Sequence, residues 1–110
     1  MRAGDLRHRV LLQRAEPGQD PESGAIVDRW VDVASVWAAI EYLSARDFIA
    51  AQAAQSQVVA RIVIRFRSDV VDTMRILHGT KIYAIAGVLP DKETGREYLT
   101  LPCSQGVTRG

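Results

Sequence analysis

Residues 56–67 constrain the fold more than any other part of the chain, because apolar and polar side chains alternate along them. A period of two residues places alternate side chains on opposite faces of an extended strand. The pattern therefore predicts a β-strand with an apolar face and a largely basic face. The apolar parity holds Val58, Ala60, Ile62, Ile64 and Phe66, and the other holds Gln57, Arg61, Arg65 and Arg67 together with Val59 and Val63.

Most of the remaining chain also has the composition of short strands separated by turns. In residues 6–13, Leu6, His8, Val10 and Leu12 share one parity and predict a first strand. Residues 15–24 are rich in Pro, Gly and acids, which predicts a polar turn or a mobile hairpin loop that adapts on assembly. Residues 26–43 are rich in β-branched and aromatic side chains, and predict two strands broken near residues 32–35.

The C-terminal third predicts two strands joined by a tight turn at residues 78–80, and then a last strand at residues 96–103. Pro102 has no backbone donor, so we expect this last strand to lie at a sheet edge or to end there. Residues 104–110 are expected to fray.

A single helix is predicted at residues 45–54. Ser44 can act as its N-cap and Asp47 follows three residues later, as in an acidic variant of the capping box. Leu43 and Phe48 have the spacing of a hydrophobic staple. Isolated helices of about this length are marginal in water, so we expect the helix to pack on another surface.

These elements predict a mainly β fold, a small antiparallel β-barrel or sandwich of six to seven strands with one short α-helix. A length of 110 residues fits one domain spanning residues 1–110.

The overall charge and the apolar runs exclude several classes of protein. A net charge of +1 argues against holding duplex DNA as the main task, since that affinity depends on neutralising phosphates. No run approaches the roughly 20 apolar residues of a membrane helix, and no signal peptide is evident, so we expect a soluble, intracellular chain. A single cysteine, Cys103, allows no internal disulfide and indicates a reducing compartment.

No group of residues has the spacing of a catalytic or metal site. Cys103, His8 and His78 lack the close ligand pairs of a zinc site. The histidines are expected in ordinary surface or half-buried positions, and Cys103 as a small packing residue. The carboxylates are scattered and the glycines form no phosphate-binding motif. We therefore expect no enzymatic activity and no cofactor.

Two groups of residues leave both a functional and a structural interpretation open. Arg61, Arg65 and Arg67 form a basic stripe that suits contact with phosphates or with acidic groups of a neighbouring subunit, and equally suits the solvated face of a strand. Trp30, Trp37 and Tyr42 suit either interface anchors or a core.

The order of these features resembles the small head–tail joining proteins of tailed bacteriophages, also called head-closure, stopper or head–tail adaptor proteins. The resemblance extends over residues 3–107. It rests on AGDLRHRVLLQR at the start, on VWAAIEYLS followed by the helix and the basic strand, and on the late MRILHGTKIYAIAGV and LPCSQGV.

The resemblance implies a non-enzymatic ring of identical subunits that closes the filled head beneath the portal or adaptor ring and docks the tail. It implies a virion protein that passes through the host cytoplasm during assembly, and a prophage or tail-like particle is an equally consistent source. It also implicates the segment between the helix and the basic strand in closing the DNA channel. The candidates that face the channel are Arg46, Gln52, Gln55 and Gln57, and those for subunit or partner contact are Arg61, Arg65 and Arg67.

The main alternative is a nucleic-acid-binding small β-barrel, a fold that binds single strands through basic and aromatic faces. It requires aromatic side chains beside the arginines, whereas Val59 and Val63 occupy those places. A small enzyme is the second alternative, and requires a convergent polar pocket that the sequence does not indicate.

Overall fold

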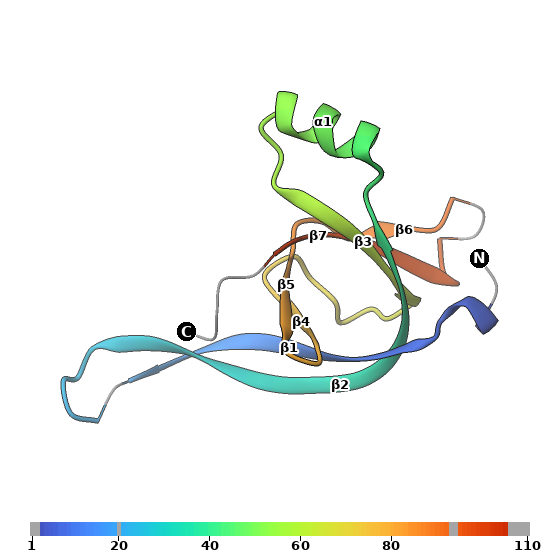
Figure 1. Cartoon of the computed structure of the whole chain (residues 1–110). Coiled ribbons are helices and arrows are strands. Elements are labelled where there is room, and N and C mark those ends of the chain that lie inside the picture. Colours follow the sequence, from blue (N-terminus) through green and yellow to red (C-terminus); the bar gives the residue numbers. More distant parts are fainter. Residues whose placement is uncertain (1–2, 20, 93–94, 106–110) are drawn as a thin grey trace.

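The computed structural model describes residues 3–19, 21–92 and 95–105, which form seven antiparallel strands, one short 3-10 helix and one α-helix (Figure 1). This confirms the predicted mainly β fold. The elements are η1 (Ala3–Asp5), β1 (His8–Gln19), β2 (Ile26–Tyr42), α1 (Ala45–Ala53), β3 (Val58–Arg65), β4 (Arg75–His78), β5 (Lys81–Ile85), β6 (Leu89–Pro90) and β7 (Tyr98–Gln105).

The strands form one sheet that curls until its two sides meet. The order is β3-β2-β1-β4-β5-β7-β6, and a further pairing of β3 with β7 makes the barrel nearly closed. That pairing runs from Val58 opposite Ser104 to Arg65 opposite Tyr98. The interior is a single apolar core whose fully buried members include Leu12, Ile62, Ile64, Ile76, Leu99, Leu101 and Cys103.

The alternation predicted for residues 56–67 is confirmed in β3. Ala60, Ile62 and Ile64 are completely buried, while Arg61 and Arg65 on the other face are exposed. Val63 shares the face of the arginines but is also buried, because it packs with Leu6, Ala39 and Tyr98 in a second, smaller apolar cluster. Both faces of β3 therefore contribute to packing.

The prediction of two strands within residues 26–43 is wrong, since β2 is one continuous strand. Leu12 lies opposite Ala34 and Gln13 opposite Asp32, so Val33 is the extra residue of a β-bulge. A bulge lets a strand bend without ending, and Val33 still packs against the core. Polar Asp32 and Ser35, which suggested a break, are exposed residues within the strand.

The loop expected at residues 15–24 is also largely strand, which is a second correction. β1 continues to Gln19 and pairs with β2 as far as Ile26, so the two strands form a long ribbon that extends away from the barrel (Figure 1). Among the described residues, β1 has a second neighbour, β4, only at residues 11–13. Pro17 fits in the ribbon because the outer edge of β1 has no neighbouring strand there, so no backbone N–H is needed to bond with one.

Pro102 was expected at a sheet edge or at the end of its strand, yet β7 continues to Gln105 and pairs with β3 on one side and with β5 and β6 on the other. The Pro102 carbonyl oxygen accepts a hydrogen bond of 2.7 Å from the Ala86 N–H. The N–H and C=O of one strand residue point to the same side. Pro102 therefore lies between the residues of β7 that pair with β5 and those that pair with β6. The backbone N–H that proline lacks would face no partner strand there, so its absence costs the sheet little.

A buried polar network fixes the point where the ribbon leaves the barrel. Gln13 is the one buried polar side chain among the described residues. Its Nε2 donates to Asp32 Oδ1 at 2.7 Å, and its Oε1 accepts from Arg75 Nε at 2.8 Å. The Arg75 guanidinium also stacks over the Trp30 ring, 4.2 Å from its centroid. Three strands are thus joined beside the bulge.

Within the described residues, no helix is long and apolar enough to cross a lipid bilayer.

We predict that Gln13→Ala lowers the free energy of unfolding by about 1–3 kcal/mol, because it removes two hydrogen bonds from a buried site and leaves their partners without them. Urea unfolding measures the change. The control Gln57→Ala alters an exposed glutamine and should stay within about 0.5 kcal/mol of the parent chain. Equal stabilities of the two variants would contradict a structural role for the network.

Candidate functional site

The helix α1 is formed by the local signals expected from the sequence. The Ser44 Oγ accepts a hydrogen bond of 3.1 Å from the Asp47 N–H, which confirms the predicted N-cap. At the other end, the Ser56 N–H donates to the Ala51 carbonyl and the Gln55 N–H to the Gln52 carbonyl. This is a Schellman motif, with Gln55 in the left-handed conformation at a φ of 60°. Gln55 thus has a structural role in ending the helix.

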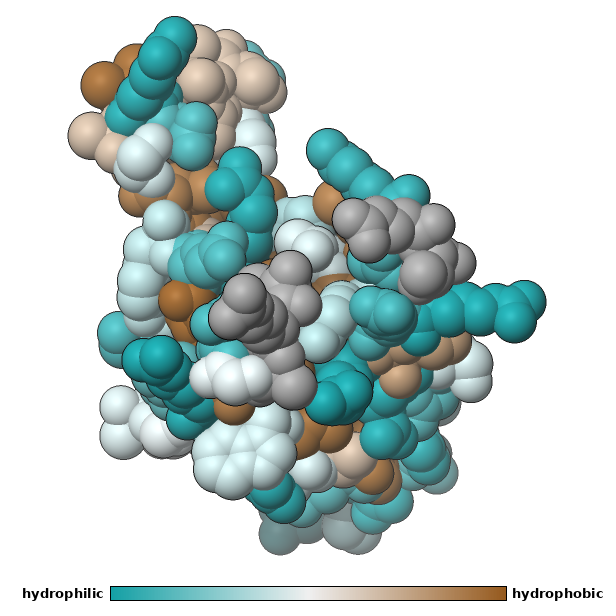
Figure 2. All heavy atoms as spheres, turned by 90° about the vertical axis from the view of Figure 1, so that its right-hand side faces the viewer, coloured by the Kyte–Doolittle hydropathy of each residue, from teal (hydrophilic) through white to brown (hydrophobic). Residues whose placement is uncertain are grey.

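No residue of α1 is buried, so the expectation that the helix packs on another surface is not met within the chain. The helix stands on two short connections above the barrel (Figure 1), and in Figure 2 it projects from the rest of the molecule with hydrophobic residues on its surface. Phe48 and Ile49 are 43% and 67% exposed. Inward packing of Phe48 and Ile49, which a helix covering the barrel end would require, is therefore not found.

The exposed side chains of α1 form an apolar stripe. At 100° per residue, Ala45, Phe48, Ile49 and Gln52 lie along one side of the helix. Gln52 is exposed and lies on the same side of the helix as Phe48 and Ile49. We call Ala45, Phe48 and Ile49 the α1 stripe.

A pair of tyrosines ties the base of α1 to the barrel. The hydroxyl groups of Tyr42, at the end of β2, and Tyr83, in β5, are 2.8 Å apart, and Lys81 Nζ donates to the Tyr42 hydroxyl at 3.1 Å. The hydrogen bond with Tyr83 makes the largest contribution to lowering the pKa of Tyr42, and the hydrogen bond from Lys81 makes the next largest. Burial, followed by the bond to Tyr42, raises the pKa of Tyr83. Tyr42 is thus the more acidic phenol.

The three aromatic residues for which core and interface roles were open differ in their exposure to solvent. Trp30 is half-buried beneath Arg75, whereas Trp37 and Tyr42 are 53% and 57% exposed. The core interpretation is therefore wrong for Trp37 and Tyr42. Arg9 covers part of the Trp37 ring at 5.1 Å and also donates to the Ser35 hydroxyl.

The three arginines of the predicted basic stripe do not act as one group. Arg61 and Arg65 are exposed on β3. Arg67 lies beyond β3 and makes two hydrogen bonds, of 3.0 and 2.9 Å, with the Asp69 carboxylate. These bonds lower the pKa of Asp69 and raise that of Arg67. A charge neutralised in this way is less suited to binding phosphate.

An open groove beside β3 has no clear signal in the sequence. It encloses about 580 Å³, and its apolar side is formed by Val63, Leu89, Pro90 and Tyr98. We call it the Leu89 groove, because Leu89 is 52% exposed there. Its charged rim consists of Glu41, Arg61, Asp91, Lys92 and Glu97. The side chains come from β2, β3, β6 and β7 and the segments beside them, so only the closed barrel brings them together.

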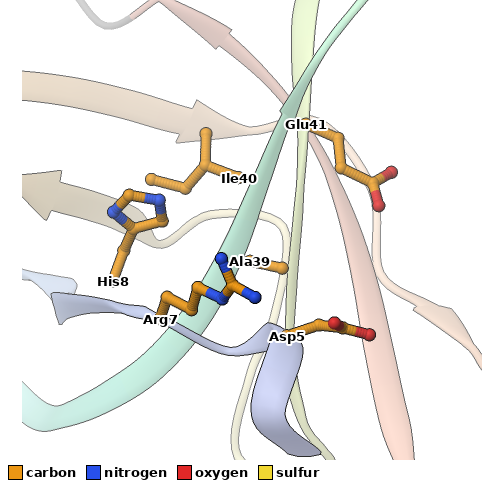
Figure 3. Close-up of a pocket in the computed structure, with 6 residues that line it drawn as sticks. All are labelled: Asp5, Arg7, His8, Ala39, Ile40 and Glu41. Atoms are coloured by element: carbon orange, nitrogen blue, oxygen red, sulfur yellow. The ribbon is translucent and has the colours of Figure 1, made fainter. Parts of the chain in front are cut away.

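A second, shallower hollow of about 360 Å³ lies between the N-terminal segment and β2 (Figure 3). Asp5, Arg7, His8 and Glu41 supply its polar side chains. His8 also meets the edge of His78, with ring centroids 5.0 Å apart. In the part of the chain that the structure describes, no three His, Cys, Asp or Glu side chains gather closely enough to hold a metal ion.

Cys103 is fully buried, and burial raises its pKa to about 12. A thiol that stays protonated is a poor nucleophile. This confirms the prediction that Cys103 is a packing residue.

Comparison with known families identifies the chain. The model of the phage head completion protein family matches residues 1–106. The chain belongs to this family. Members of the family are structural proteins of the virion, which confirms the predicted class and the expectation of a protein that is not an enzyme.

Two solved structures have the same fold as this family member. The solution structure of protein SF1141 from Shigella flexneri 2a is 28% identical, with a TM-score of 0.73, and the match covers 99% of this chain and all of that one. A chain in the virion of a native gene transfer agent particle is 18% identical, with a TM-score of 0.59, over 94% of this chain and 97% of that one. None of the curated proteins compared with the chain is similar to it in sequence.

We predict that Tyr83→Phe raises the pKa of Tyr42 toward its ordinary value, because the largest cause of its lowering is the hydrogen bond from Tyr83. The loss of this bond should also cost about 1 kcal/mol of stability. Titration of phenolate absorbance measures the pKa. Tyr98→Phe is the control and should leave the Tyr42 titration unchanged, whereas an unchanged titration in Tyr83→Phe would disprove the coupling.

Proposed function

We propose that this chain is one subunit of a homo-oligomeric ring at the head–tail interface, where it closes the DNA-filled head and docks the tail. Family membership places the chain in the virion and in head completion. The gene transfer agent chain of similar fold comes from the virion of a native particle, which fits a role within a larger particle.

The observation that carries this proposal is the unburied helix. A nine-residue helix is marginal in water unless its apolar side packs against something. The chain encodes a capped helix with Phe48 and Ile49 on its surface, yet provides no buried site for them. Exposed apolar side chains held on a projecting element are typical of a protein–protein contact. The fold thus fits a subunit that is completed by its neighbours.

The segment around α1 is the proposed boundary of the DNA channel. Arg46, Gln52, Gln55 and Gln57 are all exposed. Amide side chains can hydrogen-bond water or a neighbour without holding phosphate strongly, as a channel that passes DNA requires. Because Gln52 lies beside the apolar stripe, we assign the channel surface mainly to Gln55 and Gln57, which follow the helix.

The proposed contacts with the portal or adaptor ring and with tail proteins involve two other exposed features. The ribbon of β1 and β2 extends away from the barrel, and its far part pairs with no third strand among the described residues. Unpaired strand edges are suited to adding a partner strand. Arg61 and Arg65 remain exposed for acidic groups of a neighbour, while Arg67 is engaged with Asp69.

The test uses heads that lack this protein and are filled with DNA. Adding the purified chain should stop DNA leakage and allow tails to attach. The variant with Gln52, Gln55 and Gln57 all changed to Ala should enter the heads and attach tails but leak DNA, because the channel surface loses its amides. Gln105→Ala, an exposed glutamine outside the segment, should retain DNA.

Normal DNA retention by the triple variant, with incorporation verified, would contradict the channel assignment. Failure of the parent chain to restore either DNA retention or tail attachment would contradict the proposed function as a whole.

A further inference from the structure

We infer that the α1 stripe of one copy inserts into the Leu89 groove of the next copy, and that this contact joins neighbouring subunits. The inference rests on the proposed ring and names the surfaces that hold it together. It accounts for two features that the isolated chain leaves unsatisfied, an apolar helix without a packing partner and an apolar groove without an occupant.

A ring requires two different surfaces on each subunit. In a head-to-tail contact, one surface of a copy binds another surface of its neighbour, and repetition closes the ring. The α1 stripe is convex and lies on a projecting element, whereas the Leu89 groove is concave and belongs to the barrel wall. One chain therefore carries both halves of such a contact.

The two surfaces match in polarity. Phe48 and Ile49 offer large apolar side chains, and Val63, Leu89, Pro90 and Tyr98 form an apolar wall. A volume of about 580 Å³ is large enough to take both helix side chains. The contact would cover Ile49 and Leu89, which are the largest exposed aliphatic side chains of α1 and of the groove. Removing both from water is favourable.

Their charges are complementary as well. Three carboxylates and two bases line the groove, so its rim is net acidic. On α1, Arg46 flanks the stripe on the side of Ile49, while Asp47 points to the opposite side of the helix. The helix therefore brings a positive charge to a rim with an excess of negative charge.

The groove of the same chain is a poor site for this helix. The Leu43 N–H donates to the Val59 carbonyl at 3.1 Å, so the pairing of β2 and β3 continues to the base of α1. The bond between Tyr42 and Tyr83 fixes that base to β5. With both connections held, α1 has little slack to fold down beside β3, and the stripe and the groove are both open in the single chain.

The test introduces cysteines at both surfaces, Ile49→Cys and Leu89→Cys, in one chain. Both positions are exposed, so the fold should tolerate the changes, and the native Cys103 is buried and unreactive. We expect mild oxidation of particles that contain this variant, and of the concentrated purified protein, to give a ladder of covalent multimers. Each single variant should give no multimer.

The matched control combines Ile49→Cys with Val71→Cys, because Val71 is 50% exposed but lies outside the groove. It should give no ladder. A second measurement pairs Ile49→Lys with Leu89→Glu: each change alone should lower incorporation into heads at least tenfold, and the two together should restore it.

Three results would overturn the inference: a disulfide within one chain, dimers from Ile49→Cys alone, or no cross-link in particles that contain the variant. Native mass and tail attachment are read on the same samples. A ring that attaches tails but gives no ladder refutes only this contact. A chain that forms no ring and attaches no tail refutes the proposed function. In that case, covalent multimers of the purified protein in solution would still support the contact, and their absence would refute it.

Discussion

The pairing of β3 with β7 is the interaction on which the rest of the structure depends. It joins residues 58–65 to residues 98–104 and turns a curled sheet into a nearly closed barrel. Closure satisfies the edges of both strands and encloses one apolar core. It also brings β2, β3, β6 and β7 together around the Leu89 groove. Because the core is filled by strand residues together with Val70 and Met74 from the segment before β4, α1 has no buried site and remains outside.

This division between a closed barrel and projecting elements fits a protein that works by assembly. The barrel supplies a rigid body, to which Tyr42 and Tyr83 fix the base of α1. Gln13 and its two partners fix the root of the ribbon on another side. Both projections thus leave the barrel in defined directions, although neither contributes to its core. Such orientation suits a component of a virion, which contacts other virion proteins.

Features encoded by neighbouring residues could be predicted from the sequence, whereas those that depend on distant parts of the chain could not. The alternation in β3 and the Ser44 cap are local, and both are confirmed. The bulge at Val33 depends on the register with β1, and the position of Pro102 depends on the gap between β5 and β6. Fraying was expected over residues 104–110, but Ser104 and Gln105 belong to β7 and pair with β5, and residues 106–110 lie outside the described residues. The spacing of Arg61, Arg65 and Arg67 predicts one basic stripe. The ion pair between Arg67 and Asp69 removes Arg67 from that stripe.

Hydrogen exchange of the α1 amides is the most direct measurement of the central claim, that neighbouring subunits complete this chain. It compares the free chain with the chain assembled in the head–tail complex, with the β3 and β7 amides as an internal reference. The account predicts fast exchange in α1 of the free chain, strong protection in the complex, and slow exchange of β3 and β7 in both. Equal exchange of α1 in the free and assembled chains would contradict it.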